Sequence, residues 1–293
     1  MLGEFAGNAA AESTFEEAAG TLGYDPRTRD DARSLDSTTN VQIGLFLCGI
    51  ASARALAADG VTAQIVAGHS VGAFGAAVTA GAIAFGDALL AVRARGRAME
   101  ERFPAGYGMG VCVGVALGTV RAIVERARGG GECVYIANVN ATAQIVVSGA
   151  LSAIDGVLEE FRARGARRAE RLPVSVPSHC ELMEPVARAV REALQGVPFA
   201  APRCTYVSSM RPEILRRAGE IAEDLSEGVC SAVRWEESAR LIVELGTRLA
   251  VEVVPGHVLT DLWEPGERLR AAAMDGSRLD SIAALARRVS REA

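Results

Sequence analysis

The chain has 293 residues, of which 49% are hydrophobic and 5% aromatic, and its formal net charge is −5 at pH 7. This length and hydrophobic content exclude a disordered chain and allow one large domain, or a large and a small one, with a sizeable core. The acidic charge and low aromatic content argue against a nucleic-acid-binding protein. No apolar run approaches the roughly 18 to 20 residues of a membrane span, and the N-terminus lacks the layout of a signal peptide. We therefore expect a soluble, cytoplasmic protein with neither nucleic acid nor membrane as a partner.

Residue types narrow the chemistry further. The chain contains no lysine, so all 31 basic residues are arginines, which rules out Ser–Lys dyads, Schiff-base catalysis and a P-loop lysine. The six cysteines are widely spaced, form no C-x-x-C motif and have no histidine beside them at metal-ligand spacing. We therefore expect reduced thiols, with no metal ion and no bound cofactor.

The first segment with a chemical signature is Gly-His-Ser-Val-Gly at residues 68–72. A strand-like apolar run, 64–67, enters it, and a run of small residues with helical character, 71–82, leaves it. This context is typical of a nucleophile elbow, in which the hydroxyl of Ser70 projects from a sharp turn and the flanking glycines avoid clashes with the neighbouring strand or helix. The backbone N–H of Val71 then forms half of an oxyanion hole. The alternative is an ordinary tight turn.

A β-α-β-β-α-β pattern follows the elbow. Its expected elements are a strand at 109–116, a helix at 117–127, strands at 133–138 and 144–148, a helix at 151–164 and a strand at 169–176. This order predicts a ferredoxin-like subdomain, residues 106–177, inserted into a larger domain formed by residues 1–105 and 178–293.

The segments on either side of the insertion alternate helices with short strands, such as 205–208 and 249–253. This alternation predicts an α/β fold: a large α/β-hydrolase-like domain with a mostly parallel sheet and with the elbow at the carboxyl end of one strand. The cleft between the two parts is then the natural position for an active site.

Three histidines are candidates for a general base. His69 adjoins the serine, but neighbours on a tight turn point in different directions, so we expect it to support the elbow. His257 lies on a Pro-Gly turn and is equally compatible with a surface position. His179 follows a β-branched run that ends at a proline, on a loop or at the start of a helix over 181–194. It is our candidate base for Ser70.

A series of short segments in order along nearly the whole chain resembles the malonyl-CoA:acyl-carrier-protein transacylases. These segments are residues 68–72, Arg95-Gly96 with Met99, residues 138–140, 144–149, 174–180, 233–235 and 255–260. Within this family, residues 71–74, 167–172 and 255–257 look most like the epsilon subunit of malonate decarboxylase. Relatives that serve fatty-acid synthesis usually carry a glutamate where this chain has Ala73 and a lysine where it has His257.

The resemblance implies a mechanism. Ser70 would attack malonyl-CoA, His179 would take its proton, and a malonyl-serine ester would pass the acyl group to the prosthetic-group thiol of an acyl-carrier protein. Family members orient the histidine by a backbone carbonyl, and the matching position here is Gly228.

The resemblance also implies a substrate-binding site at Arg95 and Met99. The planar guanidinium of Arg95 would hold the free carboxylate of malonate with two hydrogen bonds. The alternative for Arg95 is a solvated position on the exposed face of a helix over 87–102.

One feature departs from the family pattern. Family members open with a Phe-Pro-Gly-Gln-Gly segment whose glutamine N–H completes the oxyanion hole, whereas this sequence begins Met1-Leu2-Gly3, which resembles the part just after it. Either the start has been placed too late or the protein lacks this segment. In the second case we expect the loss of one oxyanion donor to cost roughly 3 kcal/mol, or about a hundred- to thousand-fold in rate.

Three interpretations remain open. The first is malonyl transfer to the carrier subunit of malonate decarboxylase, and the second is malonyl transfer in fatty-acid or polyketide synthesis. The third is a catalytically impaired subunit that binds a carrier protein. A generic serine hydrolase is disfavoured, because in such enzymes an acidic residue and then a histidine near the C-terminus follow the serine.

Overall fold

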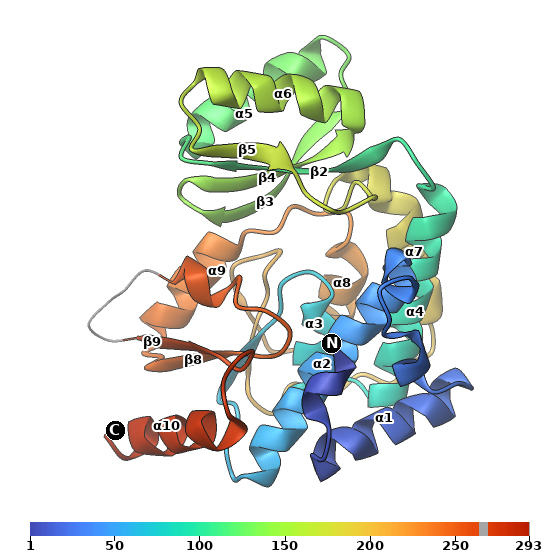
Figure 1. Cartoon of the computed structure of the whole chain (residues 1–293), viewed down its shortest axis with the longest axis vertical. Helices are drawn as coiled ribbons and strands as arrows, with labels where there is room; N and C mark the ends of the chain where they lie inside the picture. The colour runs from blue at the N-terminus through green and yellow to red at the C-terminus, as the bar shows by residue number, and fades with distance from the viewer. Residues whose placement is uncertain (264–268, 293) are drawn as a thin grey trace.

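The computed structural model describes residues 1–263 and 269–292. Helices and strands alternate along the chain, and Figure 1 shows a four-stranded sheet with two helices at one end and the remaining helices and smaller sheets at the other. The helices are α1 (Ala9–Leu22), α2 (Thr38–Ala58), α3 (Gly72–Thr79), α4 (Phe85–Arg102), α5 (Leu117–Gly129), α6 (Leu151–Ala163), α7 (Glu184–Ala193), α8 (Ala218–Glu227), α9 (Trp235–Glu244) and α10 (Leu279–Arg291). The strands are β1 (Ile65–Ala67), β2 (Tyr107–Val113), β3 (Val134–Ala141), β4 (Gln144–Ala150), β5 (Arg168–Arg171), β6 (Thr205–Val207), β7 (Ile214–Leu215), β8 (Leu249–Glu252) and β9 (Arg270–Ala273).

The larger part of the molecule contains two small sheets. One has the order β1-β6-β7, in which β1 and β6 are parallel and β7 is antiparallel to β6. The other is the parallel pair β8-β9. The α/β class predicted from the sequence is confirmed, although the sheet that leads to the elbow is mixed because the short strand β7 turns back on β6.

The four-stranded sheet has the order β3-β4-β2-β5, with every neighbouring pair antiparallel. Helices α5 and α6 cover its outer face (Figure 1). Side chains of these helices and of the sheet form a hydrophobic cluster that is separate from the core of the larger part. This strand order is that of a ferredoxin-like subdomain. On this basis we propose that residues 106–177 form an insertion into a domain built from the rest of the chain.

The last strand of this sheet is shorter than its sequence predicts. We expected a strand over 169–176, but β5 ends at Arg171. Pro173 has no N–H with which to continue the ladder, so the strand prediction was wrong beyond this point. The remaining residues form the loop that leads to His179.

Helix α2 corrects a second expectation. It has 21 residues and is long and apolar enough to cross a membrane, and 61% of its most apolar window is buried inside the protein. It packs against α1, α3 and α4 and forms part of the main hydrophobic core. Its apolar character is thus that of a central core helix, which the sequence pattern alone does not distinguish from a spanning helix.

Candidate active site

The serine lies on a sharp turn between β1 and α3. Its φ angle of 56° places Ser70 in the left-handed region, which non-glycine residues rarely adopt. A Cβ on Gly68 would clash with the backbone of Gly72 and Ala73, so this position requires glycine. A Cβ on Gly72 would meet nothing within 4 Å. The expectation that both flanking glycines are required was therefore wrong for the second.

The backbone N–H of Val71 is available to a ligand at Ser70. Val71 precedes the first residue of α3, so its N–H belongs to the group of donors left free at a helix N-terminus. Among the residues that the structure describes, no hydrogen bond is donated by this N–H. An oxyanion formed on a group bonded to Ser70 is the chemical species that such a donor stabilises.

His179 faces Ser70 from a distant segment. Its Nε2 lies 2.8 Å from Ser70 Oγ, and its Nδ1 lies 2.8 Å from the carbonyl oxygen of Gly228 and 3.2 Å from that of Ser231. Because a carbonyl oxygen only accepts, Nδ1 carries the proton and Nε2 accepts the hydroxyl proton of Ser70. The carbonyl of Gly228 thus orients the ring without an acidic side chain.

The surroundings of His179 keep its imidazole neutral. The side chain is 3% exposed, and burial, followed by the nearby positive charge of Arg95 and by His69, lowers the pKa of His179 to about 3. A neutral imidazole at pH 7 is the form that can accept a proton from a hydroxyl.

Arg95 approaches the same hydroxyl from α4. Its Nη2 donates to Ser70 Oγ at 3.1 Å, and its Nη1 donates to Gln42 Oε1. The side chain is 3% exposed, and no carboxylate among the described residues pairs with it. Burial lowers the pKa of Arg95 to about 10, which still leaves the guanidinium charged at neutral pH. A buried cation with no protein anion beside a nucleophile is set to take a carboxylate from a ligand.

Gln42 is a residue of this site that the sequence did not indicate. Besides accepting from Arg95, it donates through Nε2 to Met99 Sδ at 2.8 Å. The only hint in the sequence is Gly96, where a Cβ would lie 2.6 Å from the Cα of Thr39. This glycine lets α4 approach the start of α2, but a glycine in a helix does not say which residue approaches it.

Met99 is the second residue that the resemblance assigns to substrate binding. It is fully buried in a cluster with Phe103 and Met183, and it does not line the pocket at Ser70. Its described polar contact is with Gln42. Met99 therefore contacts the residue that accepts from Arg95, and its role in substrate binding stays a prediction.

The other two histidines lie away from the proton of Ser70. The Nε2 of half-buried His69 lies 3.1 Å from Asn140 Oδ1, and its ring packs against Trp235 at a centroid distance of 5.7 Å. His257 is exposed and its Nδ1 lies 2.8 Å from Asp261 Oδ2, which raises the pKa of His257. Neither hydrogen-bonds Ser70 in the part of the chain that the structure describes.

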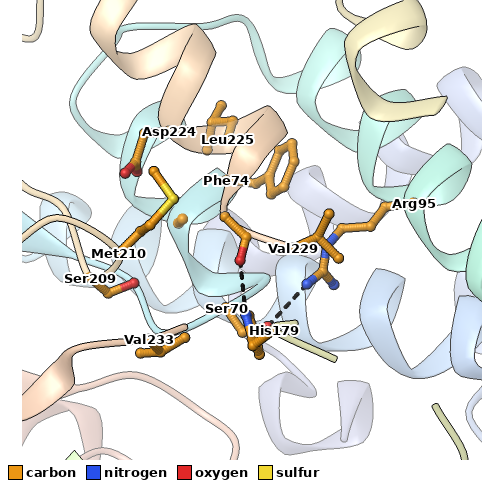
Figure 2. A pocket seen from close by; sticks show the side chains of 12 residues that line it. Ser70, Phe74, Arg95, His179, Ser209, Met210, Asp224, Leu225, Val229 and Val233 are labelled. Carbon is orange, nitrogen blue, oxygen red and sulfur yellow. Dashed lines mark hydrogen bonds between the residues drawn. The ribbon is translucent and has the colours of Figure 1, made fainter. Parts of the chain in front are cut away.

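A pocket opens beside the serine hydroxyl (Figure 2). Its wall opposite Arg95 comes from α3, α8 and the loop after β6. The lining residues are Ser70, Ala73, Phe74, Arg95, His179, Ser209, Met210, Asp224, Leu225, Gly228, Val229 and Val233. This wall is mainly apolar but contains Ser209 and Asp224, and Arg95 on the other side suits an acyl group with one charged end.

One group of potential metal ligands is found among the described residues, at Glu184, Glu227 and Cys230. Arg191 forms ion pairs with both carboxylates. The guanidinium thus already supplies the positive charge that these carboxylates require, so the group forms an ion-pair network.

Comparison with known proteins decides the family. The model of the acyl transferase domain matches residues 6–289. The chain belongs to the acyl transferase family. The family predicted from the residues is thereby confirmed, and the protein is an acyltransferase.

Relatives of this acyltransferase extend over most of its length. The malonyl CoA-acyl carrier protein transacylase of Bacillus subtilis (strain 168) is 34% identical over 270 residues, which are 90% of this chain and 85% of the relative. An acyl-carrier-protein S-malonyltransferase structure from Burkholderia pseudomallei 1710b is 35% identical, with a TM-score of 0.90 over 97% of this chain and 94% of that one. A malonyl-transacylase solved in complex with a type II polyketide acyl-carrier protein is 32% identical, with a TM-score of 0.86 over 94% of this chain and 91% of the other.

Proposed function

We propose that the protein transfers a malonyl group from malonyl-CoA to an acyl-carrier protein through a malonyl ester of Ser70. The observation that carries this proposal is the position of the serine hydroxyl, which donates to neutral His179 and accepts from the buried cation Arg95. One side chain prepares the nucleophile, and the other provides the charge that distinguishes malonyl from acetyl groups. The names of the relatives favour the same donor and acceptor.

In the first half-reaction, Ser70 Oγ attacks the thioester carbonyl carbon while its proton passes to His179 Nε2. The carbonyl oxygen becomes an oxyanion that accepts from the N–H of Val71. When this intermediate collapses, the carbon–sulfur bond breaks, and the CoA thiolate leaves with the proton from His179. The products are the malonyl-serine ester and free CoA.

The second half-reaction reverses these steps with a different thiol. The prosthetic-group thiol of the carrier gives its proton to His179 and attacks the ester carbonyl. The bond to Ser70 Oγ breaks, and the serine recovers its proton from the imidazole. In both half-reactions Arg95 holds the malonyl carboxylate, and all of the chemistry uses groups of the chain and its substrates.

Intact-mass measurement after brief exposure to malonyl-CoA tests the proposal. The unmodified protein should gain one malonyl group, and Ser70→Ala should gain none, because the alanine has no nucleophilic oxygen. The matched control is Ser13→Ala, which removes an exposed hydroxyl on α1 and should still become labelled. Labelling that persists in Ser70→Ala would refute the assignment of the nucleophile. An unlabelled unmodified protein would favour a subunit that only binds a carrier protein.

We further propose that the carrier is that of malonate decarboxylase. The support for this finer function is the resemblance at residues 71–74, 167–172 and 255–257, together with the departures at Ala73 and His257. The curated relatives are instead named as malonyl CoA-acyl carrier protein transacylases, which favours a carrier of fatty-acid or polyketide synthesis as the alternative.

Transfer kinetics to the two carriers, measured side by side, distinguish these functions. Malonate decarboxylase carriers bear a longer prosthetic group than ordinary phosphopantetheine carriers, so the enzyme should transfer faster to the former. The malonyl-enzyme formed with the same malonyl-CoA stock serves both reactions, which makes acylation an internal control. A clear preference for the fatty-acid carrier would establish the alternative.

A further inference from the structure

The pocket wall contains a buried carboxylate that the proposed mechanism does not use. Asp224, on α8, is 3% exposed and lies on the far side of the pocket from Arg95 (Figure 2). It does not act as the acid of a catalytic triad, because His179 Nδ1 donates to backbone carbonyls. A carboxylate buried in this way is costly unless it is well hydrogen-bonded.

Two hydroxyl groups donate to this carboxylate. Tyr206 on β6 donates from its phenol to Oδ2 at 3.0 Å, and Ser208 donates from Oγ to Oδ1. Burial raises the pKa of Asp224, and these two hydrogen bonds act in the opposite direction. Both donors lie on β6 or directly after it, so Asp224 holds the end of the strand that pairs with β1.

Ser208 passes this constraint to the backbone of a turn. Its Oγ accepts from the N–H groups of Met210 at 3.2 Å and Arg211 at 3.0 Å. A hydroxyl that accepts twice has only its proton left to donate, and Asp224 is the acceptor of that proton. Removal of the carboxylate would leave a buried hydroxyl without an acceptor at the centre of this turn.

The same turn reaches the nucleophile elbow through Ser209. This buried side chain donates from Oγ to the carbonyl oxygen of Gly68 at 2.8 Å. The carbonyl oxygen of Ser209 accepts from the N–H of Arg234 at 2.7 Å, which anchors the turn on its other side. Gly68 begins the elbow, so this hydrogen bond fixes the backbone two residues before Ser70.

We propose that Asp224 is a positioning residue for Ser70 that acts through the Ser208–Ser209 turn and the carbonyl of Gly68. The left-handed φ of Ser70 costs about 1 to 3 kcal/mol and persists only where the surroundings hold it. Gly68 has no side chain with which to pack the start of the elbow, so its carbonyl is a point at which a neighbouring segment can hold the turn. The role of Asp224 in malonyl transfer rests on the proposed function, whereas its control of the geometry of Ser70 does not.

The test measures the reactivity of Ser70 with an alkyl fluorophosphonate, which requires no acyl substrate. In this reaction Ser70 Oγ bonds to phosphorus, fluoride leaves, and His179 receives the serine proton. Asp224→Ala and Ser209→Ala should each slow labelling of Ser70 by at least about tenfold, because small displacements of a nucleophile cause large losses of rate. The matched control is Glu223→Gln, which alters an exposed carboxylate one residue earlier on α8 and should label at the unmodified rate.

The double variant separates positioning from general destabilisation. If Asp224 acts through Ser209, the double variant should label no more slowly than the slower single variant, whereas independent effects would multiply. Asp224→Asn keeps one acceptor for Ser208 and should recover most of the labelling rate lost in Asp224→Ala. Thermal unfolding of each variant shows that the labelled protein is folded. If Asp224→Ala does not fold, Ser209→Ala still tests the last hydrogen bond of this series, from Ser209 to the carbonyl of Gly68.

Labelling of Ser209→Ala at the unmodified rate, or multiplying effects in the double variant, would overturn the inference. Failure of the proposed function gives a different result: normal fluorophosphonate labelling of the unmodified protein with no malonyl ester formed from malonyl-CoA. With malonyl-CoA as the reagent, Asp224→Ala should lower the maximum acylation rate and leave the half-saturating concentration unchanged, because Arg95 is intact.

Discussion

The two sides of the candidate active site reach the same unusual backbone conformation by different means. Ser70 and His179 are the two non-glycine residues with positive φ among the described residues, at 56° and 64°, and their side chains hydrogen-bond each other. On the serine side, the turn follows from neighbouring residues: strand β1, Gly68, which a Cβ would disrupt, and helix α3. On the histidine side, the conformation depends on a segment about 50 residues later.

The backbone contacts of His179 show this dependence. Its N–H donates to the carbonyl oxygen of Val229 at 2.9 Å, and its ring donates to that of Gly228. Both acceptors follow α8, which packs against α7. A locally determined turn is readable from sequence, whereas a turn held by distant carbonyls is not, because every residue type carries a carbonyl.

The largest expected effect distinguishes the base from the other histidines. His179→Ala should lower the rate of malonyl-serine formation by about 10² to 10⁴, because no other group among the described residues accepts the proton of Ser70. The measurement is single-turnover acylation with malonyl-CoA. His257→Ala is the matched control and should leave this rate unchanged, since His257 is exposed and pairs with Asp261. A greater loss in His257→Ala would mean that the wrong histidine has been assigned.

The locally determined side can be disrupted by a single methyl group. Gly68→Ala places a Cβ against the backbone of Gly72 and Ala73, and it should lower the free energy of unfolding by about 3 kcal/mol. Gly72→Ala adds the same methyl group to the other flanking glycine, where the space is open, and should change stability by less than about 1 kcal/mol. Chemical denaturation of both variants checks the pair. Equal losses in the free energy of unfolding would contradict the inference that only Gly68 is required at the elbow.

The sequence predicted the local parts of the molecule and left out the parts made by contacts between distant segments. The elbow and the β-α-β-β-α-β order were readable because strands, helices and glycines leave periodic or steric signatures. The contact of Gln42 with Arg95 was not readable, because it depends on how closely α2 approaches α4. Asp224 was missed because an acidic residue on an amphipathic helix is normally exposed, and only the contact with a distant strand buries it.

Arg95 should control the choice of acyl group. Arg95→Ala leaves the malonyl carboxylate without its charged partner. The loss of transition-state stabilisation, taken from the specificity constants, should therefore be about 2 kcal/mol larger for malonyl-CoA than for acetyl-CoA. Competition between the two thioesters for Ser70, read by intact mass, gives the difference directly. The matched control is Arg97→Ala, which removes an exposed arginine two residues further along α4 and should leave the preference between the two thioesters unchanged. An equal loss on both substrates would assign Arg95 a structural role.

The smallest expected effect tests the electrostatic environment of the base through stability. The pKa of His179 is about 3 in the folded protein, against an ordinary value of 6.5. Below pH 6.5 the unfolded chain therefore binds a proton at this residue that the folded protein does not bind, and stability falls as the pH falls. Between pH 7.5 and 5.5 this difference amounts to about 1.4 kcal/mol.

His179→Gln removes this titration and should therefore lose about 1.4 kcal/mol less stability than the unmodified protein over the same pH interval. The measurement is urea denaturation at the two pH values. His69 and His257 remain in both proteins, so their contributions cancel in the comparison. If both proteins lose the same free energy, the pKa of His179 in the folded protein lies close to its ordinary value of 6.5, and its surroundings do not lower it. Such an imidazole is still mostly neutral at pH 7.5, so that result would contradict the electrostatic account of His179 and leave its role as general base in place.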